Sequence, residues 1–113
     1  MAKQYDKRPD MALEDGKTYL AVIELEKGGE ILVDLFSKDA PETVNSFVFL
    51  AGDGYYDGLT FHRVIPGFVA QAGDPTGTGS GGPGYNVPDE VNDNKHIEGT
   101  LSMAKTAGPD SAG

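Results

Sequence analysis

The chain has 113 residues, with 18 Asp and Glu against nine Lys and Arg, which gives a formal net charge of −9. This length fits one domain, and a domain of this size has a thin core. The acidic balance argues against a nucleic-acid partner, because affinity for the phosphate backbone depends on clustered Lys and Arg. The lack of cysteine excludes disulfides, thiolate chemistry and cysteine-based zinc sites.

No targeting or membrane-spanning segment is predicted. Residues 1–10 alternate in charge and lack the apolar stretch of a signal peptide. The longest strictly apolar run, residues 47–51, is far shorter than the ~18 residues that cross a bilayer. We therefore expect a cytoplasmic protein without a membrane partner.

The first half of the chain predicts a polar arm, a β-hairpin and one helix. Residues 1–17 are polar and aperiodic, typical of a tail or a weakly docked arm. The side chains of residues 19–35 follow the two-residue period of β-strands. Gly28 and Gly29, within this segment, tolerate the positive φ of a tight turn. A helix is predicted over residues 41–51, beginning at Pro41.

This helix is expected to cover the sheet with one apolar stripe and to end at Gly52 in a left-handed conformation. The stripe has the helical spacing i, i+3, i+4 and i+7, and consists of Val44, Phe47, Val48 and Ala51.

The second half predicts short strands and long loops. Strands are expected over residues 60–65 and 69–72, on either side of Pro66 and Gly67, and over residues 99–105. Residues 73–96 are rich in Gly, Pro, Asn and Asp and predict a long loop, a kind of segment that is usually functional or disordered. Much β structure with one helix favours a barrel or a sandwich over a doubly wound α/β fold.

Two motifs for cofactors are rejected. The glycines at positions 77, 79 and 82 fit a dinucleotide fingerprint, but the proline-rich residues after them cannot start the helix that this motif requires. His62 and His96 lie far apart, so we expect no metal site, but a hydrogen-bonded strand histidine and an exposed loop histidine. No cofactor is predicted, and an enzyme built on this chain would work without a metal, a thiol or a covalent intermediate.

Arg63 is one of two arginines and stands among apolar residues. A strand arginine ordinarily points to solvent with its stem along the sheet. A two-residue turn would put Arg63 and Gln71 on opposite faces, whereas a three-residue loop would set them opposite each other on one face. The second register would group a guanidinium, an amide and the exposed ring of Phe68 into a site that could hold a neutral peptide.

The residues around Arg63, FHRVIPGFVAQAGD at positions 61–74, resemble the signature of the cyclophilin family of peptidyl-prolyl cis-trans isomerases. The likeness extends over most of the chain, through APETVNSF at 40–47, YYDGL at 55–59, the glycine-rich residues 77–84 and LSMAKTAGP at 101–109. It implies a mainly β fold with one or two helices, the closed antiparallel β-barrel of cyclophilins, left incomplete in this chain.

The resemblance also implies an activity, the rotation of X–Pro peptide bonds that assists protein folding. Arg63 would be the principal catalytic residue, Phe68 an aromatic wall of the proline pocket, and Gln71 the residue that orients Arg63 and the substrate. Val69 would extend the apolar wall, and the groove for residues that precede the proline would be lined by Gly79, Ala104 and Lys105. The implied partners are proline-containing peptides or unfolded proteins, and cyclosporin.

Cyclophilins continue beyond the segment that resembles residues 108–113 into strands that complete the barrel and the pocket. Residues 18–113 are therefore expected to be the N-terminal portion of a cyclophilin-like domain: a fragment, a shortened form, or one half of an assembly. A complementary C-terminal fragment or a strand-exchanged copy is the implied partner. The alternative functions are a proline-peptide-binding module without catalysis and a partly unfolded half-domain.

Overall fold

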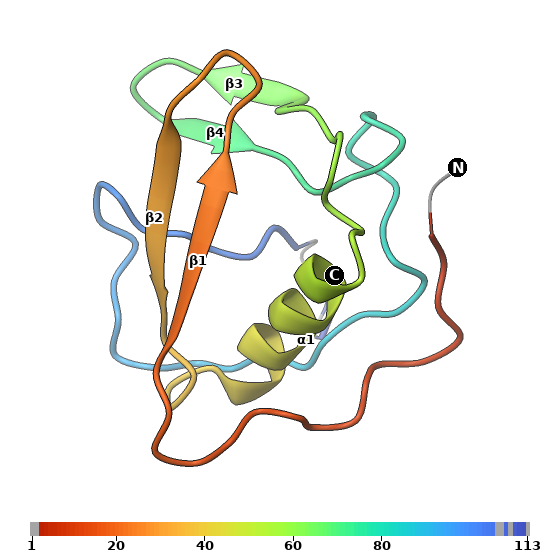
Figure 1. Cartoon of the computed structure of the whole chain (residues 1–113), viewed down its shortest axis with the longest axis vertical. Coiled ribbons are helices and arrows are strands. Elements are labelled where there is room, and N and C mark those ends of the chain that lie inside the picture. Colours follow the sequence, from red (N-terminus) through yellow and green to blue (C-terminus); the bar gives the residue numbers. More distant parts are fainter. Residues whose placement is uncertain (1–2, 106–107, 109, 113) are drawn as a thin grey trace.

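The computed structural model describes residues 3–105, 108 and 110–112 and contains five regular elements (Figure 1). They are β1 (Tyr19–Glu24), β2 (Glu30–Leu35), α1 (Pro41–Gly52), β3 (Arg63–Ile65) and β4 (Val69–Gln71). The predicted mainly β fold with one helix is confirmed. The strands form two separate antiparallel pairs, β1 with β2 and β3 with β4. No closed barrel therefore forms within the described residues, which is compatible with an incomplete barrel.

The β1–β2 hairpin has the predicted position and turn. Gly28 and Gly29 have φ angles of 97° and 94°, in the left-handed region that glycine tolerates. The Leu25 N–H donates to the Gly29 carbonyl oxygen at 3.1 Å and closes the turn. One face of the hairpin is largely open to solvent, with exposed fractions of 61% for Leu20, 49% for Val22 and 65% for Leu32.

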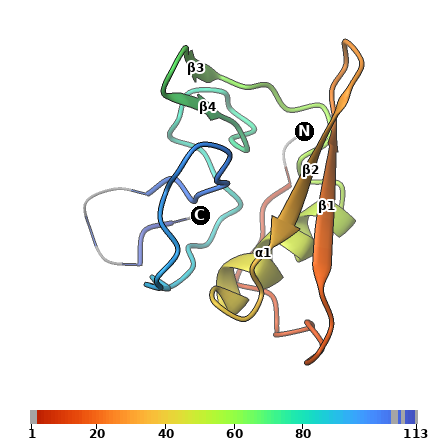
Figure 2. The same ribbon diagram turned by 90° about the vertical axis from the view of Figure 1, so that its left-hand side faces the viewer.

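Helix α1 lies beside the end of the hairpin opposite its turn (Figures 1 and 2). It begins at Pro41, as predicted, but includes Gly52, so the prediction of a left-handed cap at that residue was wrong. The Asp53 N–H still donates to the Phe49 carbonyl oxygen at 3.0 Å, which carries the helical bonding past Gly52. The left-handed residue is instead Gly54, with a φ of 77°.

The buried face of α1 differs from the predicted stripe. Of the four stripe residues only Val44 is buried, while Ala51 is exposed. The helix buries two polar side chains instead, Asn45 and Ser46, at 2% and 5% exposure. Buried polar groups need hydrogen-bond partners, and both residues have them.

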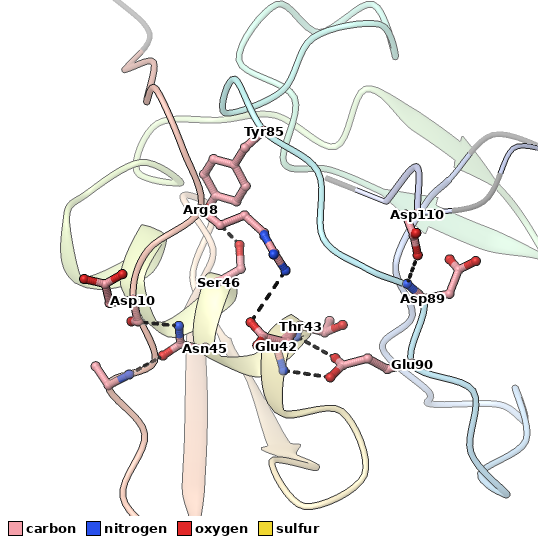
Figure 3. A network of polar contacts seen from close by, with 11 residues as sticks. Arg8, Asp10, Glu42, Thr43, Asn45, Ser46, Tyr85, Asp89, Glu90 and Asp110 are labelled. Carbon is pink, nitrogen blue, oxygen red and sulfur yellow. Dashed lines mark hydrogen bonds and ion pairs between the residues drawn. The ribbon is translucent and has the colours of Figure 1, made fainter.

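These partners come from distant parts of the chain (Figure 3). The Asn45 side chain donates to the Asp10 carbonyl oxygen at 3.1 Å and accepts from the Ala12 N–H at 3.0 Å. The Ser46 hydroxyl lies 2.8 Å from the Tyr85 hydroxyl. The N-terminal arm, here residues 3–17, is thus docked on the helix at Asn45, and the arm and Tyr85 together explain the polar buried face.

The N-terminus of α1 is capped by a carboxylate from the long loop. Ala40 precedes the helix and has no side chain that can accept a hydrogen bond. The N–H groups of Glu42 and Thr43 donate to the two carboxylate oxygens of Glu90, at 2.8 and 2.7 Å (Figure 3). The first N–H groups of a helix lack helical partners, and its positive end favours an anion, so Glu90 satisfies both needs.

Two predicted strands are shorter than expected and one is absent. β3 starts only at residue 63 and β4 ends at residue 71. Residues 99–105 form no strand, contrary to the prediction. A strand needs a pairing partner, and the one isolated bridge among the described residues lies elsewhere, between Val87 and Ala112.

The long loop is organised by Asp74, which belongs to the segment from 74 to 84 that we call the glycine-rich loop. One carboxylate oxygen accepts from the N–H and hydroxyl of Thr76, both at 2.8 Å. The other accepts from the N–H groups of Gly79 at 2.6 Å and Gly81 at 3.0 Å. A Cβ at Gly81 would lie 2.1 Å from Asp74 Oδ1, so this close approach requires glycine. Among the described residues, no helix begins after the glycine-rich loop.

The apolar core is small, as the chain length predicts. Its buried members are Val44, Leu50, Tyr55, Val87 and Ala112. Within the described residues, no helix has the length and apolar character needed to span a bilayer. Polar contacts between distant segments therefore carry much of the organisation.

The Glu90 cap generates a stability prediction. Glu90→Ala is expected to lower the free energy of unfolding by about 1–2 kcal/mol, the usual cost of a lost helix cap, and the Tm by about 5–10 °C. Glu90→Gln keeps an acceptor oxygen but loses the charge, so its Tm should lie between those of the wild type and Glu90→Ala. Thermal unfolding followed by circular dichroism measures the effect. Glu26→Ala, in the exposed β1–β2 turn, is the control, and equal Tm values for Glu90→Ala and Glu26→Ala would contradict the prediction.

Asp74 generates a pH prediction. Burial opposes the charged form, but the hydrogen bonds from Thr76, Gly81 and Gly79 outweigh it and hold the pKa of the Asp74 carboxyl well below its usual range. A depressed folded-state pKa stabilises the fold fully above the unfolded-state pKa of about 3.9, and this contribution is lost as the pH falls further.

We therefore expect the amide NMR signals of Gly79 and Gly81 in the folded chain to keep their neutral-pH positions down to about pH 4, where an ordinary aspartate titrates, and to move only as the pH falls well below that value. Asp74→Asn should place these signals near their low-pH positions at every pH, because the neutral amide accepts hydrogen bonds more weakly than a carboxylate. Asp15→Asn, an exposed change in the arm, should leave the wild-type titration unchanged. Glycine signals that do not respond to Asp74→Asn would refute this role of the carboxylate.

Candidate functional site

The β3–β4 hairpin has the register of the three-residue loop. Arg63 pairs with Gln71, so the two side chains emerge on the same face. The Phe68 N–H donates to the Ile65 carbonyl oxygen at 3.0 Å, and Gly67 has a φ of 76°. Of the two registers that the sequence left open, the structure adopts the one that groups the predicted residues.

Arg63, Gln71 and Phe68 form the centre of the candidate site. Arg63 Nη1 donates to Gln71 Oε1 at 3.3 Å, which uses one of the five N–H donors of the guanidinium. The guanidinium carbon of Arg63 lies 6.0 Å from the centroid of the Phe68 ring. Phe68 is 75% exposed. An oriented donor thus stands beside an accessible apolar ring, an arrangement suited to a ligand with a carbonyl next to an apolar ring.

A broad hollow of about 2680 Å³ opens next to this centre. Its volume exceeds the roughly 300–1000 Å³ of ordinary small-molecule pockets, and its lining extends from β1 through the glycine-rich loop to Lys105, so we describe it as a broad trough between segments. Six of the seven predicted site residues line it, namely Arg63, Val69, Gln71, Gly79, Ala104 and Lys105.

Gly79 lies on the side of the trough formed by the glycine-rich loop. A Cβ at this position would be 4.0 Å from His62 Nε2, so the loop passes close to the imidazole. Both ring nitrogens of His62 are shielded from solvent and have no hydrogen-bond partner among the described residues, so the prediction of a hydrogen-bonded histidine was wrong. The residue precedes β3 and lies outside the strand ladder. His96 is exposed, as predicted, with its Nε2 3.2 Å from the Ser102 hydroxyl.

Lys105 forms an ion pair with Asp89. Its ammonium lies 2.6 Å from Asp89 Oδ1. The hydrogen bond from Lys105 is the main cause that holds the pKa of the Asp89 carboxyl below its usual range. The structure thus places Lys105 on the wall of the trough but brings it into no direct contact with the Arg63 centre. In the part of the chain that is described, no three His, Asp or Glu side chains gather in a way that could hold a metal ion.

Three residues that join distant or irregular segments of the fold were not singled out by the sequence analysis. Asp74 carries a weak local signal, because an aspartate two residues before a threonine favours a turn closed by its own side chain. Glu90 and Tyr5 carry no such signal, since the hydrogen-bond partners of their side chains, at Glu42, Thr43 and Asp53, lie 47 or 48 residues away in sequence.

Comparisons with known proteins agree with the resemblance in the sequence. The family described as "Cyclophilin type peptidyl-prolyl cis-trans isomerase/CLD" matches residues 20–113. A peptidyl-prolyl cis-trans isomerase of Synechococcus elongatus is 63% identical over 84 residues, which cover 74% of this chain and 57% of that protein. Peptidyl-prolyl cis-trans isomerase B of Bacillus subtilis is 55% identical over 91 residues, which cover 79% of this chain and 63% of that protein.

A further relative, a peptidyl-prolyl cis-trans isomerase of Helicobacter pylori, is 51% identical over 113 residues, which cover 98% of this chain and 67% of that protein. The chain thus spans less than two thirds of the Synechococcus and Bacillus proteins that it matches. Because the family match covers more than half of the chain, and because the Arg63 centre lies within it, the protein belongs to the cyclophilin-type peptidyl-prolyl cis-trans isomerase family.

Proposed function

We propose that this chain carries the catalytic centre of a peptidyl-prolyl cis-trans isomerase, with Arg63 as the catalytic residue. The observation that carries the proposal is the pairing of Arg63 with Gln71 beside the exposed ring of Phe68. The family match supports the reaction class, and the geometry supports the assignment of the residues.

The reaction needs no bond to be made or broken. Rotation about an X–Pro bond has a barrier of ~18–20 kcal/mol, because the planar amide is stabilised by resonance. Twisting the amide removes this resonance and leaves the proline nitrogen more basic. A guanidinium that hydrogen-bonds the twisted amide more strongly than the planar one lowers the barrier by differential binding. Gln71 holds the guanidinium in place, so little reorganisation is needed during the rotation.

The other predicted residues have binding roles in this proposal. The ring of Phe68 and the side chain of Val69 contact the proline, while Gly79, Ala104 and Lys105 line the groove for the residues before it. Substrates are then proline-containing peptides and unfolded proteins, which present such segments in extended form. Cyclosporin, a cyclic peptide, would compete for the same groove.

We further propose that a complementary C-terminal segment covers the open side of the trough. Large apolar side chains are exposed on the hairpin and around the site, among them Leu32 at 65%, Val64 at 61% and Leu101 at 52%. Such patches ordinarily bind another surface. The Synechococcus and Bacillus relatives extend beyond the part that this chain matches, which leaves room in them for such a segment.

The open trough also favours a second candidate function, a proline-peptide-binding module without turnover. Phe68 is 75% exposed, so the ring that would hold the proline is contacted on few sides. Binding to such an open wall buries part of the peptide surface but does not favour the twisted form of its X–Pro amide.

Arg63→Ala tests the catalytic role. The variant is expected to lower kcat/KM for an Ala-Ala-Pro-Phe peptide at least about 100-fold, the usual cost of removing a preorganised donor. Arg63 is an exposed strand residue, so the Tm should change little. The rate is measured by NMR exchange between the cis and trans peptide. The matched control is Arg8→Ala, which removes the other arginine and a 3.8 Å surface ion pair to Glu42. Equal rates for the two variants would rule out Arg63 as the catalytic residue.

The complementary segment distinguishes the two candidate functions. The exchange rate is measured for the chain alone and with an added peptide corresponding to the C-terminal third of the Synechococcus relative. Isomerisation that increases on addition, and that Arg63→Ala abolishes, supports the enzyme. Peptide-induced amide shifts without any rate enhancement in either sample would support the binding module and contradict the enzyme.

A further inference from the structure

The N-terminal arm lies outside the family match, which begins at residue 20, yet it packs on the domain. Tyr5 is its main anchor. The Tyr5 ring lies 5.2 Å from Phe49 in α1, 6.2 Å from Tyr55 after the helix, and 6.4 Å from Tyr85 in the long loop, measured between centroids. Aromatic pairs at such distances attract each other, so one side chain of the arm joins three segments of the domain.

The arm also donates hydrogen bonds to backbone carbonyl oxygens of the glycine-rich loop. The Tyr5 N–H donates to the Pro83 carbonyl oxygen at 2.8 Å, and the Gln4 side chain donates to the Gly82 carbonyl oxygen at 2.7 Å. A Cβ at Gly84 would lie 2.5 Å from the Tyr5 carbonyl oxygen, so the arm approaches the loop as closely as glycine allows. We call this contact the Gln4–Tyr5 clamp.

The outer end of Tyr5 is fixed as well. Its hydroxyl donates to Asp53 Oδ2 at 2.5 Å, and Lys3 forms an ion pair with the same carboxylate at 3.5 Å. The hydrogen bond to Asp53 raises the pKa of Tyr5 to about 12, so the hydroxyl remains a donor at neutral pH. The ring, the hydroxyl and the backbone of Tyr5 are therefore all held.

The clamped residues are next to those that face the groove. Gly82 follows Gly81 directly, and Asp74 holds the N–H groups of Gly81 and Gly79 on one carboxylate oxygen. A shift of the loop at Gly82 therefore displaces the Asp74 hydrogen bonds, and with them Gly79 on the wall of the trough.

We propose that the Gln4–Tyr5 clamp sets the position of the glycine-rich loop, and that Tyr5 is a positioning residue for the groove that binds the peptide before its proline. The inference rests on the proposed function for the groove, but the placement of the loop can be measured without it.

The test compares amide NMR spectra and peptide affinity for the full chain and its variants. Tyr5→Ala is expected to shift the Gly79 and Gly81 signals and to weaken binding of the Ala-Ala-Pro-Phe peptide about fivefold, which corresponds to about 1 kcal/mol. Tyr5→Phe keeps the ring and the backbone contact, so both readouts should return toward the wild type. Met11→Ala truncates another apolar side chain of the arm, 48% exposed, and should change neither.

Gln4→Ala covers the case in which Tyr5→Ala does not fold. It removes one exposed hydrogen bond of the clamp and should still shift Gly79 and Gly81, by less. The proposal is overturned if Gln4→Ala leaves both signals at their wild-type positions, or if a folded Tyr5→Ala lowers the Tm while the signals and the affinity stay unchanged. If the wild type binds no proline peptide, the proposed function fails, and the two glycine signals still decide whether the clamp positions the loop.

Discussion

The site depends on the register of one short hairpin. With a three-residue loop between β3 and β4, Arg63 stands opposite Gln71; with one residue fewer, every side chain of one strand would move to the other face. The loop backbone determines this register. Gly67 adopts a positive φ, and the Phe68 N–H donates a hydrogen bond to the Ile65 carbonyl oxygen. The proposed role of Arg63 therefore depends on the backbone conformation of the loop between β3 and β4, a few residues away.

The acidic character of the chain is in part structural. The sequence has twice as many acidic as basic side chains, 18 against nine, and several carboxylates accept hydrogen bonds instead of only facing solvent. Asp74 holds the glycine-rich loop, Glu90 caps α1, and Asp53 receives the Tyr5 hydroxyl. Carboxylates accept several N–H groups at once, which suits them to join segments whose backbone has no strand or helix partner. In a domain with few buried apolar residues, such contacts supply organisation that a larger core would otherwise give.

Features with local causes could be predicted from the sequence. The Gly28 turn, the start of α1 at Pro41 and the absence of regular structure in the long loop all follow from the residues at those places. The β3–β4 register could be narrowed to two possibilities but not decided, because both loop lengths are compatible with the same residues.

Features with distant causes could not be predicted. Asn45 and Ser46 look like the solvent face of an amphipathic helix, and only their partners in the arm and at Tyr85 make that face buried. The strand expected over residues 99–105 has the right residues but no neighbouring strand to pair with in the described structure. Local sequence propensity favours a helix or a strand, but tertiary contacts determine whether that element forms.

The carboxylate cap of α1 comes from a residue 48 positions after the first helical N–H that it accepts. The helix thus lacks its cap while the intervening chain is being synthesised, a delay of roughly 2–10 s at ordinary rates of translation. An isolated helix of 12 residues is marginal in water. During synthesis, α1 therefore gains the stabilisation by its cap only after Glu90 has been added to the chain. The long loop thus completes a helix that lies wholly before it in the chain.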